Sequence, residues 1–275
     1  MANLDPIIVS CVNLKGGVGK TAIAVNFAAY CGMIGIKTLL VDLDPQTNAT
    51  FSCMTVEAWQ KHAAEQGSVA NLLGARGHTS AEGQEKSAES IILQSVFKGV
   101  DLVPSHLDLF TVDLDLSSEV ARETRLRRSL KDVIGKYEII VCDCPPNLTI
   151  PTQNALAMST HYVVPVSLDF LSSLGIGLLL GRIKKLSDDL ENPIEHAGIV
   201  LSRVGRKSYF KMQTAATLKK AFGDSVLDAQ IKERSAVSES AAKNLPIYQM
   251  SDREAASEFR AFSAELLPRL GWKKK

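Results

Sequence analysis

The chain has 275 residues, of which 45% are hydrophobic and 22% charged, and its formal net charge is only +1. That composition is typical of an ordinary globular protein, and the length fits one large α/β domain or two small ones. The five cysteines contain no C-x-x-C pair, which argues against a disulfide framework or a zinc knuckle, and the five histidines show no ligand spacing. No basic-then-apolar leader opens the sequence, so we expect a cytoplasmic protein.

Short β-branched runs alternate with longer helical stretches along the chain. The predicted strands are Ile7–Val12, Lys37–Asp42, Val100–Pro104, Glu138–Asp143, His161–Val166, Ala197–Ser202 and Ser225–Ile231. The predicted helices are Lys20–Met33, Thr124–Gly135, Asn154–Met158, Leu174–Leu190, Phe210–Phe222, Ser235–Lys243 and Arg253–Leu267. This alternation predicts a single α/β domain over residues 1–275, with a mostly parallel, twisted sheet and helices on both faces. The small, polar segment 67–90 is interpreted as a surface insertion.

The first predicted strand leads into the segment VNLKGGVGKT, residues 12–21. A glycine run between a strand and a helix turns backbone N–H groups toward one point, where the positive helix N-terminus favours polyphosphate. Lys20 is expected to reach the β- and γ-phosphates, and the Thr21 hydroxyl to bind Mg²⁺. The segment departs from the pattern G-x-x-x-x-G-K-[ST], because Leu14 stands where the first glycine is expected and Lys15 adds a second cation.

Acidic residues follow two other predicted strands. Asp42 and Asp44 lie in LLVDLDPQTNAT, and Asp143 lies in EIIVCDCPP. One carboxylate beside the γ-phosphate can orient water for in-line attack, and another can hold the metal through water, while Asp143 occupies the position of a Walker B ligand. A lone Asp at a strand end is equally well a helix cap or a turn residue. The three elements in this order predict a P-loop ATPase that uses ATP and Mg²⁺.

The run GVGKTA also fits the dinucleotide fingerprint G-x-G-x-x-[GA], with Asp42 near the distance of a ribose-binding acid. An NAD enzyme is therefore an alternative. It would leave Lys15, Lys20, Thr21 and Asp143 without a role, and residues 13–16 separate the strand from Gly17. Competition between NAD and a fluorescent ATP analogue would separate the two hypotheses.

These motifs identify a family resemblance that covers nearly the whole chain. K-G-G-x-G-K-T is the deviant Walker A motif, and the sequence resembles the ParA/Soj-type partition ATPases, which are relatives of MinD. The similarity rests on NLKGGVGKT, LLVDLDPQTNATF, VARETRLRRSLKDVIGKYEIIVCDCPPNLTIPTQNAL and a weaker IKERSAVSESAAKNLPI. The start N-x-K-G-G is similar to ParA proteins, whereas MinD proteins usually show S-G-K-G-G.

The resemblance implies a role for each residue of the site. Lys15 would reach across a dimer interface to the phosphates of the partner's ATP, so that nucleotide state sets oligomeric state; the alternative is an ordinary exposed loop lysine. Asp44 would orient the attacking water, and Thr21, Asp42 and Asp143 would act through magnesium. The full nucleotide-binding set is expected at Lys15, Gly16, Gly17, Val18, Gly19, Lys20, Thr21, Ala22 and Asp143.

Two departures from the family pattern lie in the segment IKERSAVSES, where relatives often have IPRNVRLSEA. Lys232 replaces the proline that lies near adenine in the family, which leaves the base pocket undefined. Ala236 replaces an arginine associated with DNA binding, and this removes one expected phosphate contact.

The stretch 203–223 carries cations and no acid, and its charge exceeds the net charge of the whole chain. It predicts a patch for non-specific double-stranded DNA, doubled by dimerisation, at Arg203, Arg206, Lys207, Lys211, Lys219 and Lys220. Lys207 falls where the family has a DNA-contacting arginine. The alternative is that these basic side chains are simply solvated on a helix surface, with acidic residues elsewhere in the fold balancing their charge. The resemblance implies an ATP-dependent homodimer that associates with the nucleoid and is released when a ParB-like partner stimulates hydrolysis.

A MinD-like, membrane-associated positioning ATPase is the other functional alternative. MinD proteins end in a basic amphipathic helix, whereas this chain ends in AELLPRLGWKKK, where Pro268 and Gly271 interrupt a helix. We therefore expect no membrane partner.

Overall fold

The computed structural model describes residues 5–74, 86–169, 172–206 and 208–273. They form one eight-stranded sheet in the order β3-β4-β2-β5-β1-β6-β7-β8. The strands are β1 Ile7–Cys11, β2 Thr38–Asp42, β3 Leu93–Phe97, β4 Val100–Val103, β5 Ile139–Asp143, β6 His161–Val166, β7 Glu195–Val204 and β8 Val226–Lys232. All neighbouring pairs are parallel except β3 with β4. The predicted α/β fold with a mostly parallel sheet is confirmed.

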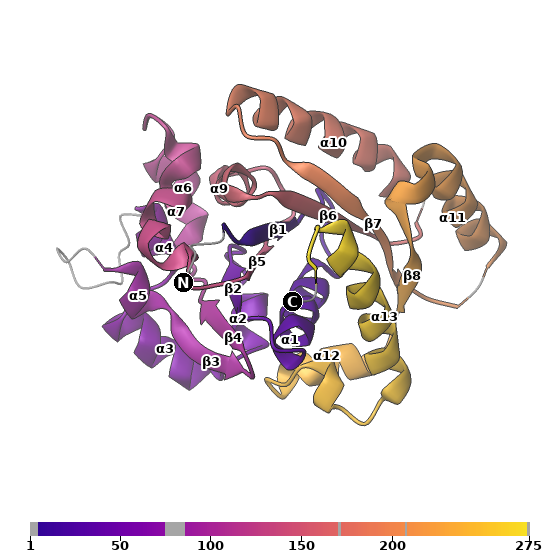
Figure 1. The fold of residues 1–275 in the computed structure, drawn as a ribbon, viewed down its shortest axis with the longest axis horizontal. Coiled ribbons are helices and arrows are strands. Elements are labelled where there is room, and N and C mark those ends of the chain that lie inside the picture. The colour runs from indigo at the N-terminus through magenta and orange to yellow at the C-terminus, as the bar shows by residue number, and fades with distance from the viewer. Residues whose placement is uncertain (1–4, 75–85, 170–171, 207, 274–275) are drawn as a thin grey trace.

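Helices cover both faces of this sheet (Figure 1). They are α1 Lys20–Met33, α2 Asn48–Phe51, α3 Val56–Glu65, α4 Val69–Leu73, α5 Ala88–Ile91, α6 Leu109–Asp115, α7 Arg125–Ser129, α8 Lys131–Ile134, α9 Ile150–Met158, α10 Ser172–Asp189, α11 Tyr209–Phe222, α12 Ser235–Ala242 and α13 Arg253–Arg269. Short 3₁₀ turns span Arg122–Thr124, Gly223–Ser225 and Ile247–Gln249.

Two apolar cores hold these layers together, one on each face of the sheet. On one face, α1 and α13 meet at Phe27 and Phe262, whose rings pack edge to face with centroids 6.1 Å apart. On the other face, α4, α7, α9 and α10 bury their apolar sides against the same strands. The central strands β2 and β5 are buried at every position because both of their faces are covered, which explains their continuous apolar sequence.

Several elements were not predicted. The strand β3 and the helices α2 to α6 lie in segments for which no strand or helix was predicted, and most of these helices are too short to show a helical period. The predicted helix Thr124–Gly135 is broken, because the N–H of Val133 closes onto the carbonyl of Leu130 in a 3₁₀-type turn between α7 and α8. Leu126, Leu130 and Val133 are nevertheless buried, so the predicted apolar stripe is retained.

The predicted surface insertion at 67–90 falls only partly on described residues, since 75–85 lie outside them. Within its first part, α4 buries Val69 and Leu73 completely in the core. Ser68 caps this helix by accepting from the N–H of Ala70 at 3.2 Å. The beginning of the segment is therefore part of the packed fold, although its composition is small and polar.

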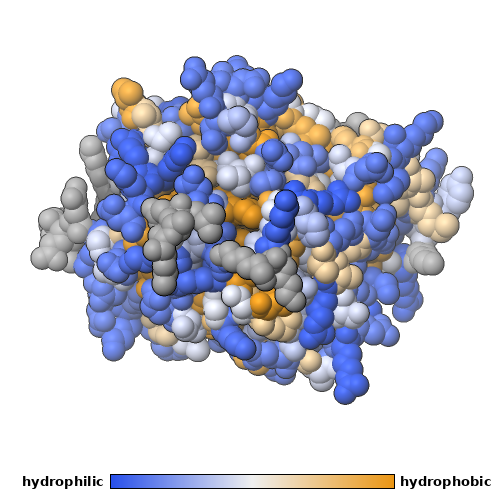
Figure 2. Space-filling view, in the orientation of Figure 1, coloured by the Kyte–Doolittle hydropathy of each residue, from blue (hydrophilic) through white to orange (hydrophobic). Residues whose placement is uncertain are grey.

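The face of the molecule in Figure 2 is mostly hydrophilic, with apolar residues in small separate areas. Within the ranges given above, none of the helices combines the length and the apolar character needed to span a bilayer.

Candidate nucleotide-binding site

Parallel pairing brings the predicted site residues to one edge of the sheet. The register places Cys11 of β1 opposite Asp143 of β5, and Asp143 in turn opposite Asp42 of β2. The loop Asn13–Gly19 leaves the end of β1 at this edge and leads into α1 at Lys20. Ligands of open parallel sheets bind outside the carboxyl ends of such strands, where helices begin. The three strand-end motifs found in the sequence therefore meet at one point.

Asn13 fixes the start of the loop. Its side-chain amide donates to the carbonyl of Pro165 in β6 at 2.6 Å, and its side-chain oxygen accepts from the N–H of Lys15 at 2.9 Å. The sequence drew attention to Asn13 only as part of the family motif. In the structure this side chain ties the loop to the strand beside β1.

Lys20 lies inside the loop. Its side chain is buried, and its ammonium donates to the carbonyl of Lys15 at 3.2 Å. Burial lowers the pKa of Lys20, while the carboxylates of Asp143 and Asp44 act in the opposite direction. A buried cation that donates to a neutral carbonyl is suited to an anion delivered to the loop.

Asp143 is the least satisfied carboxylate of the site. It is completely buried, and neither of its oxygens accepts a hydrogen bond of ordinary geometry from the described residues. Burial raises its pKa well above the usual range, with Asp42 adding to the rise and the nearby Thr21 hydroxyl opposing it. An unpartnered buried carboxylate beside a hydroxyl is a donor set that Mg²⁺ accepts. The residues present therefore fit the metal.

The described residues contain no group of three or more His, Cys, Asp or Glu side chains arranged to hold a metal ion. This agrees with the preference of Mg²⁺ for one or two protein ligands, completed by water and by phosphate. Thr21 and Asp143 are the residues that would hold it here.

Asp42 has a different environment from Asp143. One of its oxygens accepts from the N–H and the hydroxyl of Thr50, both at 2.7 Å, and the other accepts from the N–H of Asp44 at 3.1 Å. Burial raises the pKa of Asp42 to about 7, although these hydrogen bonds lower it. With three of its four acceptor sites occupied, Asp42 organises the segment between β2 and α2.

Asp44 lies on that segment and is also buried. One carboxylate oxygen accepts from the N–H of Gln46 at 2.9 Å, and its backbone carbonyl accepts from the hydroxyl of Ser105 at 2.7 Å. The N–H of Ser105 donates to the Thr50 hydroxyl at 2.9 Å, which closes a network from Asp42 to Asp44. Thr50 and Ser105 were missed from the sequence because no motif marks them.

A cleft of about 840 Å³ opens over the loop. Gly16, Gly17, Gly19, Lys20, Thr21, Ala22 and Asp44 line it on one side, and residues of β8 and α12 line it on the other. The side chain of Val18 is buried and does not line the cleft, although the backbone of Val18 is part of the phosphate loop. The volume is within the range of small-molecule and cofactor sites.

Lys232 and Arg234 lie on the far wall of this cleft. The ammonium of Lys232 is 3.4 Å from Glu258, and the guanidinium of Arg234 is 2.7 Å from Glu254 and 2.8 Å from Glu258. Ala236 is buried and so offers no surface for a DNA contact. At the position of the family's proline, this chain therefore has a cation held by an acid of α13.

Lys15 points away from the loop interior. Its ammonium forms an ion pair with Asp169, which follows β6, and both side chains are about two-fifths exposed, at 41% and 40%. Lys20 is thus buried and lines the cleft, whereas Lys15 is partly exposed and is not among the residues that line it. Lys20 is available to a nucleotide in its own cleft, and Lys15 to a molecule that approaches the surface.

The predicted DNA-binding residues differ in their partners, and Arg203 and Lys219 are paired although both are exposed. Arg203 lies against the loop and pairs with Glu233 at 2.6 Å, and Lys219 donates to Val226 and Asp228. Lys211 is half-buried with its ammonium against Gly205. Lys207 lies outside the described residues.

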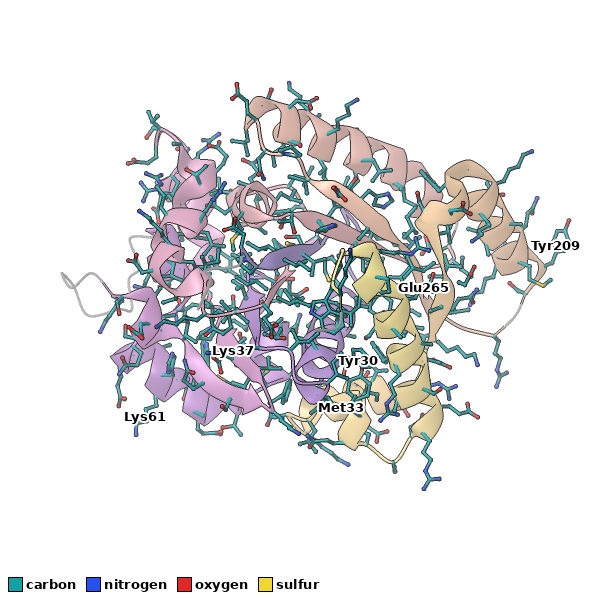
Figure 3. All side chains as sticks on the ribbon, in the orientation of Figure 1. Tyr30, Met33, Lys37, Lys61, Tyr209 and Glu265 are labelled. Carbon is teal, nitrogen blue, oxygen red and sulfur yellow. The ribbon has the colours of Figure 1, made fainter. Side chains whose placement is uncertain are left out.

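Arg206 and Lys220 are exposed. Tyr209, at the start of the same helix α11, is 84% exposed and projects from the molecule in Figure 3. The end of α11 near Arg206 is therefore its most accessible part.

Comparison with known proteins agrees with this geometry. A family model described as an AAA domain matches residues 7–196. The sporulation initiation inhibitor protein Soj of Bacillus subtilis is 31% identical over 251 residues, which cover 91% of this chain and 94% of Soj. The chromosome partitioning protein ParA of Caulobacter vibrioides is 29% identical over 242 residues, covering 87% of this chain and 85% of ParA.

Among solved structures, the fold is similar to cobyrinic acid a,c-diamide synthase from Mycobacterium smegmatis with a bound ATP analogue and magnesium. The TM-score is 0.78 at 23% identity, over 98% of both chains. At this identity the likeness concerns the fold alone. The family model and the relatives extend over most of the sequence and include every strand-end motif of the site. The chain belongs to the ParA/Soj family of partition ATPases.

Proposed function

We propose that this protein is a Mg²⁺-dependent partition ATPase whose two copies close around two ATP molecules, with Lys15 of each copy contacting the nucleotide of the other. The observation that supports this most directly is the different burial of the two loop lysines. Lys20 is buried beneath the loop, whereas Lys15 is held at the surface by Asp169. A single nucleotide in the cleft needs Lys20 but leaves Lys15 available for a second molecule.

The nucleotide is held from two sides. Backbone N–H groups of residues 16–22 and the Lys20 ammonium bind the phosphates, and the 840 Å³ cleft has room for the remainder of ATP. Magnesium bound through Thr21 and Asp143 would neutralise part of the phosphate charge. Its positive charge also explains how a buried, unpartnered Asp143 is tolerated.

Hydrolysis requires a water aligned with the γ-phosphate. Asp44 is the residue proposed to orient it, because its carboxylate lines the same cleft as Lys20 and Thr21. The Asp42–Thr50–Ser105 network fixes the backbone on both sides of Asp44. Asp42 is therefore proposed to act on the metal site through this segment rather than by direct contact.

The dimer is proposed to bind DNA without sequence preference and to release it on hydrolysis. Exposed cations near α11, Arg206 and Lys220, support this together with the half-buried Lys211. A ParB-like partner would stimulate hydrolysis and define the cargo. Because the ATP form is proposed to bind DNA, we expect it on the nucleoid in the cytoplasm. The membrane alternative gains no support, since Trp272 packs against the core rather than extending from it.

The deciding experiment is sedimentation velocity of the protein and of Lys15→Ala, each with ADP and with a non-hydrolysable ATP analogue. The parent should dimerise with the analogue only, and Lys15→Ala should bind nucleotide but remain monomeric. Lys37→Ala, a change of the same type on an exposed residue away from the loop, is the matched control. Normal ATP-dependent dimers of Lys15→Ala would refute the proposal.

A further inference from the structure

The end of β7 contacts the phosphate loop beside the cleft. The hydroxyl of Ser202 donates to the carbonyl of Val18 at 2.5 Å, and the guanidinium of Arg203 donates to the carbonyl of Gly17 at 2.8 Å. Two consecutive strand residues thus bind two consecutive carbonyls of the loop. The other end of the guanidinium donates to Glu233 at 2.6 Å, which ties the loop to β8 as well.

These bonds determine where the loop's N–H groups point. A trans peptide is planar, so its carbonyl and its N–H point in opposite directions. Fixing the Gly17 carbonyl fixes the direction of the N–H of Val18, and fixing the Val18 carbonyl does the same for the N–H of Gly19. Arg203 and Ser202 therefore orient two backbone donors of the loop, and both residues also line the cleft above it.

The loop needs such support because its own backbone is permissive. Gly17 and Gly19 have φ angles of 73° and 86°, a region that glycine leaves as easily as it enters. Arg203 itself has φ of 49°, which is unfavourable for a residue with a side chain. Surrounding structure has to maintain a conformation of that kind, and here the contacts of Arg203 with Gly17 and Glu233 do so.

The same residues continue into the basic segment. Beyond Arg203, the carbonyl of Val204 accepts from the N–H of Glu233 at 3.1 Å, and Lys211 of α11 lies against Gly205. Ser208 then caps α11 by accepting from the N–H of Lys211 at 3.3 Å. Only residues 204–208 separate Arg203 from the start of α11 in the sequence.

We propose that Ser202 and Arg203 are positioning residues for nucleotide binding. They hold the carbonyls of Gly17 and Val18 and so fix the directions of the N–H groups of Val18 and Gly19, which bind the polyphosphate. Arg203 then acts on the loop rather than on DNA. This inference rests on the proposed function only in assuming that ATP and ADP bind in the cleft.

The test is titration of a fluorescent ADP analogue, without DNA, into the parent, Arg203→Met, Arg203→Lys and Ser202→Ala. Loss of a charge-assisted or buried hydrogen bond to the loop should weaken ADP binding about three- to tenfold in Arg203→Met and in Ser202→Ala. Arg203→Lys keeps one donor for the Gly17 carbonyl and should recover part of the affinity. Lys219→Met, which removes a cation bound to β8 but not to the loop, is the matched control and should bind like the parent.

Thermal unfolding of the same proteins separates positioning from folding. The nucleotide-free melting temperature of Ser202→Ala and Arg203→Lys should stay near that of the parent, while their shift at a fixed ADP concentration decreases. Arg203→Met and Ser202→Ala that bind ADP as tightly as the parent would overturn the inference. If instead the parent failed to bind ADP at all, the proposed function would fail and not this assignment.

Discussion

The ammonium of Lys15 is paired with the carboxylate of Asp169 in the same chain, whereas the ammonium of Lys20 donates to the backbone carbonyl of Lys15. In the proposed dimer, this ammonium has to leave Asp169 to reach a phosphate of the partner. The pair therefore competes with dimerisation. Because both side chains are about two-fifths exposed, the competition is weak, on the order of 0–1 kcal/mol.

Removing the acid should consequently favour the dimer. We expect Asp169→Asn to lower the concentration of ATP analogue needed for half-maximal dimerisation by up to about fivefold, measured by sedimentation at fixed protein concentration. The effect should diminish at high salt, because the pair is partly exposed. Asp228→Asn, which removes an acid from an exposed pair with Lys219, is the control. Weaker dimerisation of Asp169→Asn would show that Asp169 assists Lys15 rather than restraining it.

Asp44 is predicted to control the lifetime of the dimer. Asp44→Ala removes the carboxylate proposed to orient water but leaves the loop and the Ser105 contact to the Asp44 carbonyl unchanged. We expect ATP turnover to fall on the order of hundredfold or more while ATP-dependent dimers persist. Phosphate release and sedimentation with ATP, followed over the same hours, would check both results.

Asp44→Asn provides a second variant, because its amide oxygen can still accept from the N–H of Gln46. It should also be slow, which would show that the charge and not the turn is required. Turnover of either variant at the parental rate would exclude Asp44 from this role.

Much of this site could be predicted because its residues lie in short contiguous motifs at strand ends. The three strands that lead into these motifs, β1, β2 and β5, were predicted to within one residue at each end. Their convergence follows from parallel pairing, which places equivalent strand ends at one edge of the sheet.

The contacts that define the surroundings of these motifs could not be predicted. Asp169, Ser202 and Glu233 each approach the loop from a different strand, at sequence distances that no local pattern encodes. The number of basic residues in 203–223 also did not show which of them are paired with other groups. It treats Arg203 and Lys219 as free cations, whereas the fold directs one to the loop and the other to Asp228.

Thr50 is predicted to stabilise the segment between β2 and α2. Its hydroxyl donates to Asp42 and accepts from the N–H of Ser105, and all three groups are buried. Thr50→Val keeps the shape but leaves the Ser105 N–H without this acceptor, so we expect a loss of about 2–3 kcal/mol in the free energy of unfolding. Urea denaturation with an unchanged m-value would measure it. Thr217→Val, on the exposed face of α11, should change stability little.

The loss should depend on pH. Burial raises the pKa of Asp42 to about 7, so its folded form holds a proton that the unfolded form releases near pH 4, and stability from this group declines between those values. The Thr50 hydroxyl lowers that pKa, so removing it raises the pKa further and extends the decline to higher pH. Thr50→Val should therefore be more destabilising at pH 8 than at pH 5. An equal loss at both values would mean that the hydroxyl does not stabilise the Asp42 carboxylate.

DNA binding is predicted to depend on the accessible cations near α11 and not on all six basic residues. If about three phosphates are neutralised per protomer, log K for the dimer should fall with log salt at a slope of about −5. Arg206→Ala and Lys220→Ala should each weaken binding and reduce the magnitude of that slope by about 2, because every dimer loses two contacts. Fluorescence anisotropy with a short duplex, a non-hydrolysable ATP analogue and several salt concentrations gives both quantities.

Lys219→Ala is the informative comparison for this prediction. Lys219 is adjacent to Lys220 in sequence, but its ammonium donates to the carbonyl of Val226 and to Asp228. It should leave the slope close to that of the parent, since a cation already bound to an acid releases few additional counterions from DNA. If Lys219→Ala and Lys220→Ala reduced the slope equally, the patch would act as a diffuse charge. A slope near zero in the parent would rule out direct phosphate contacts at α11 altogether.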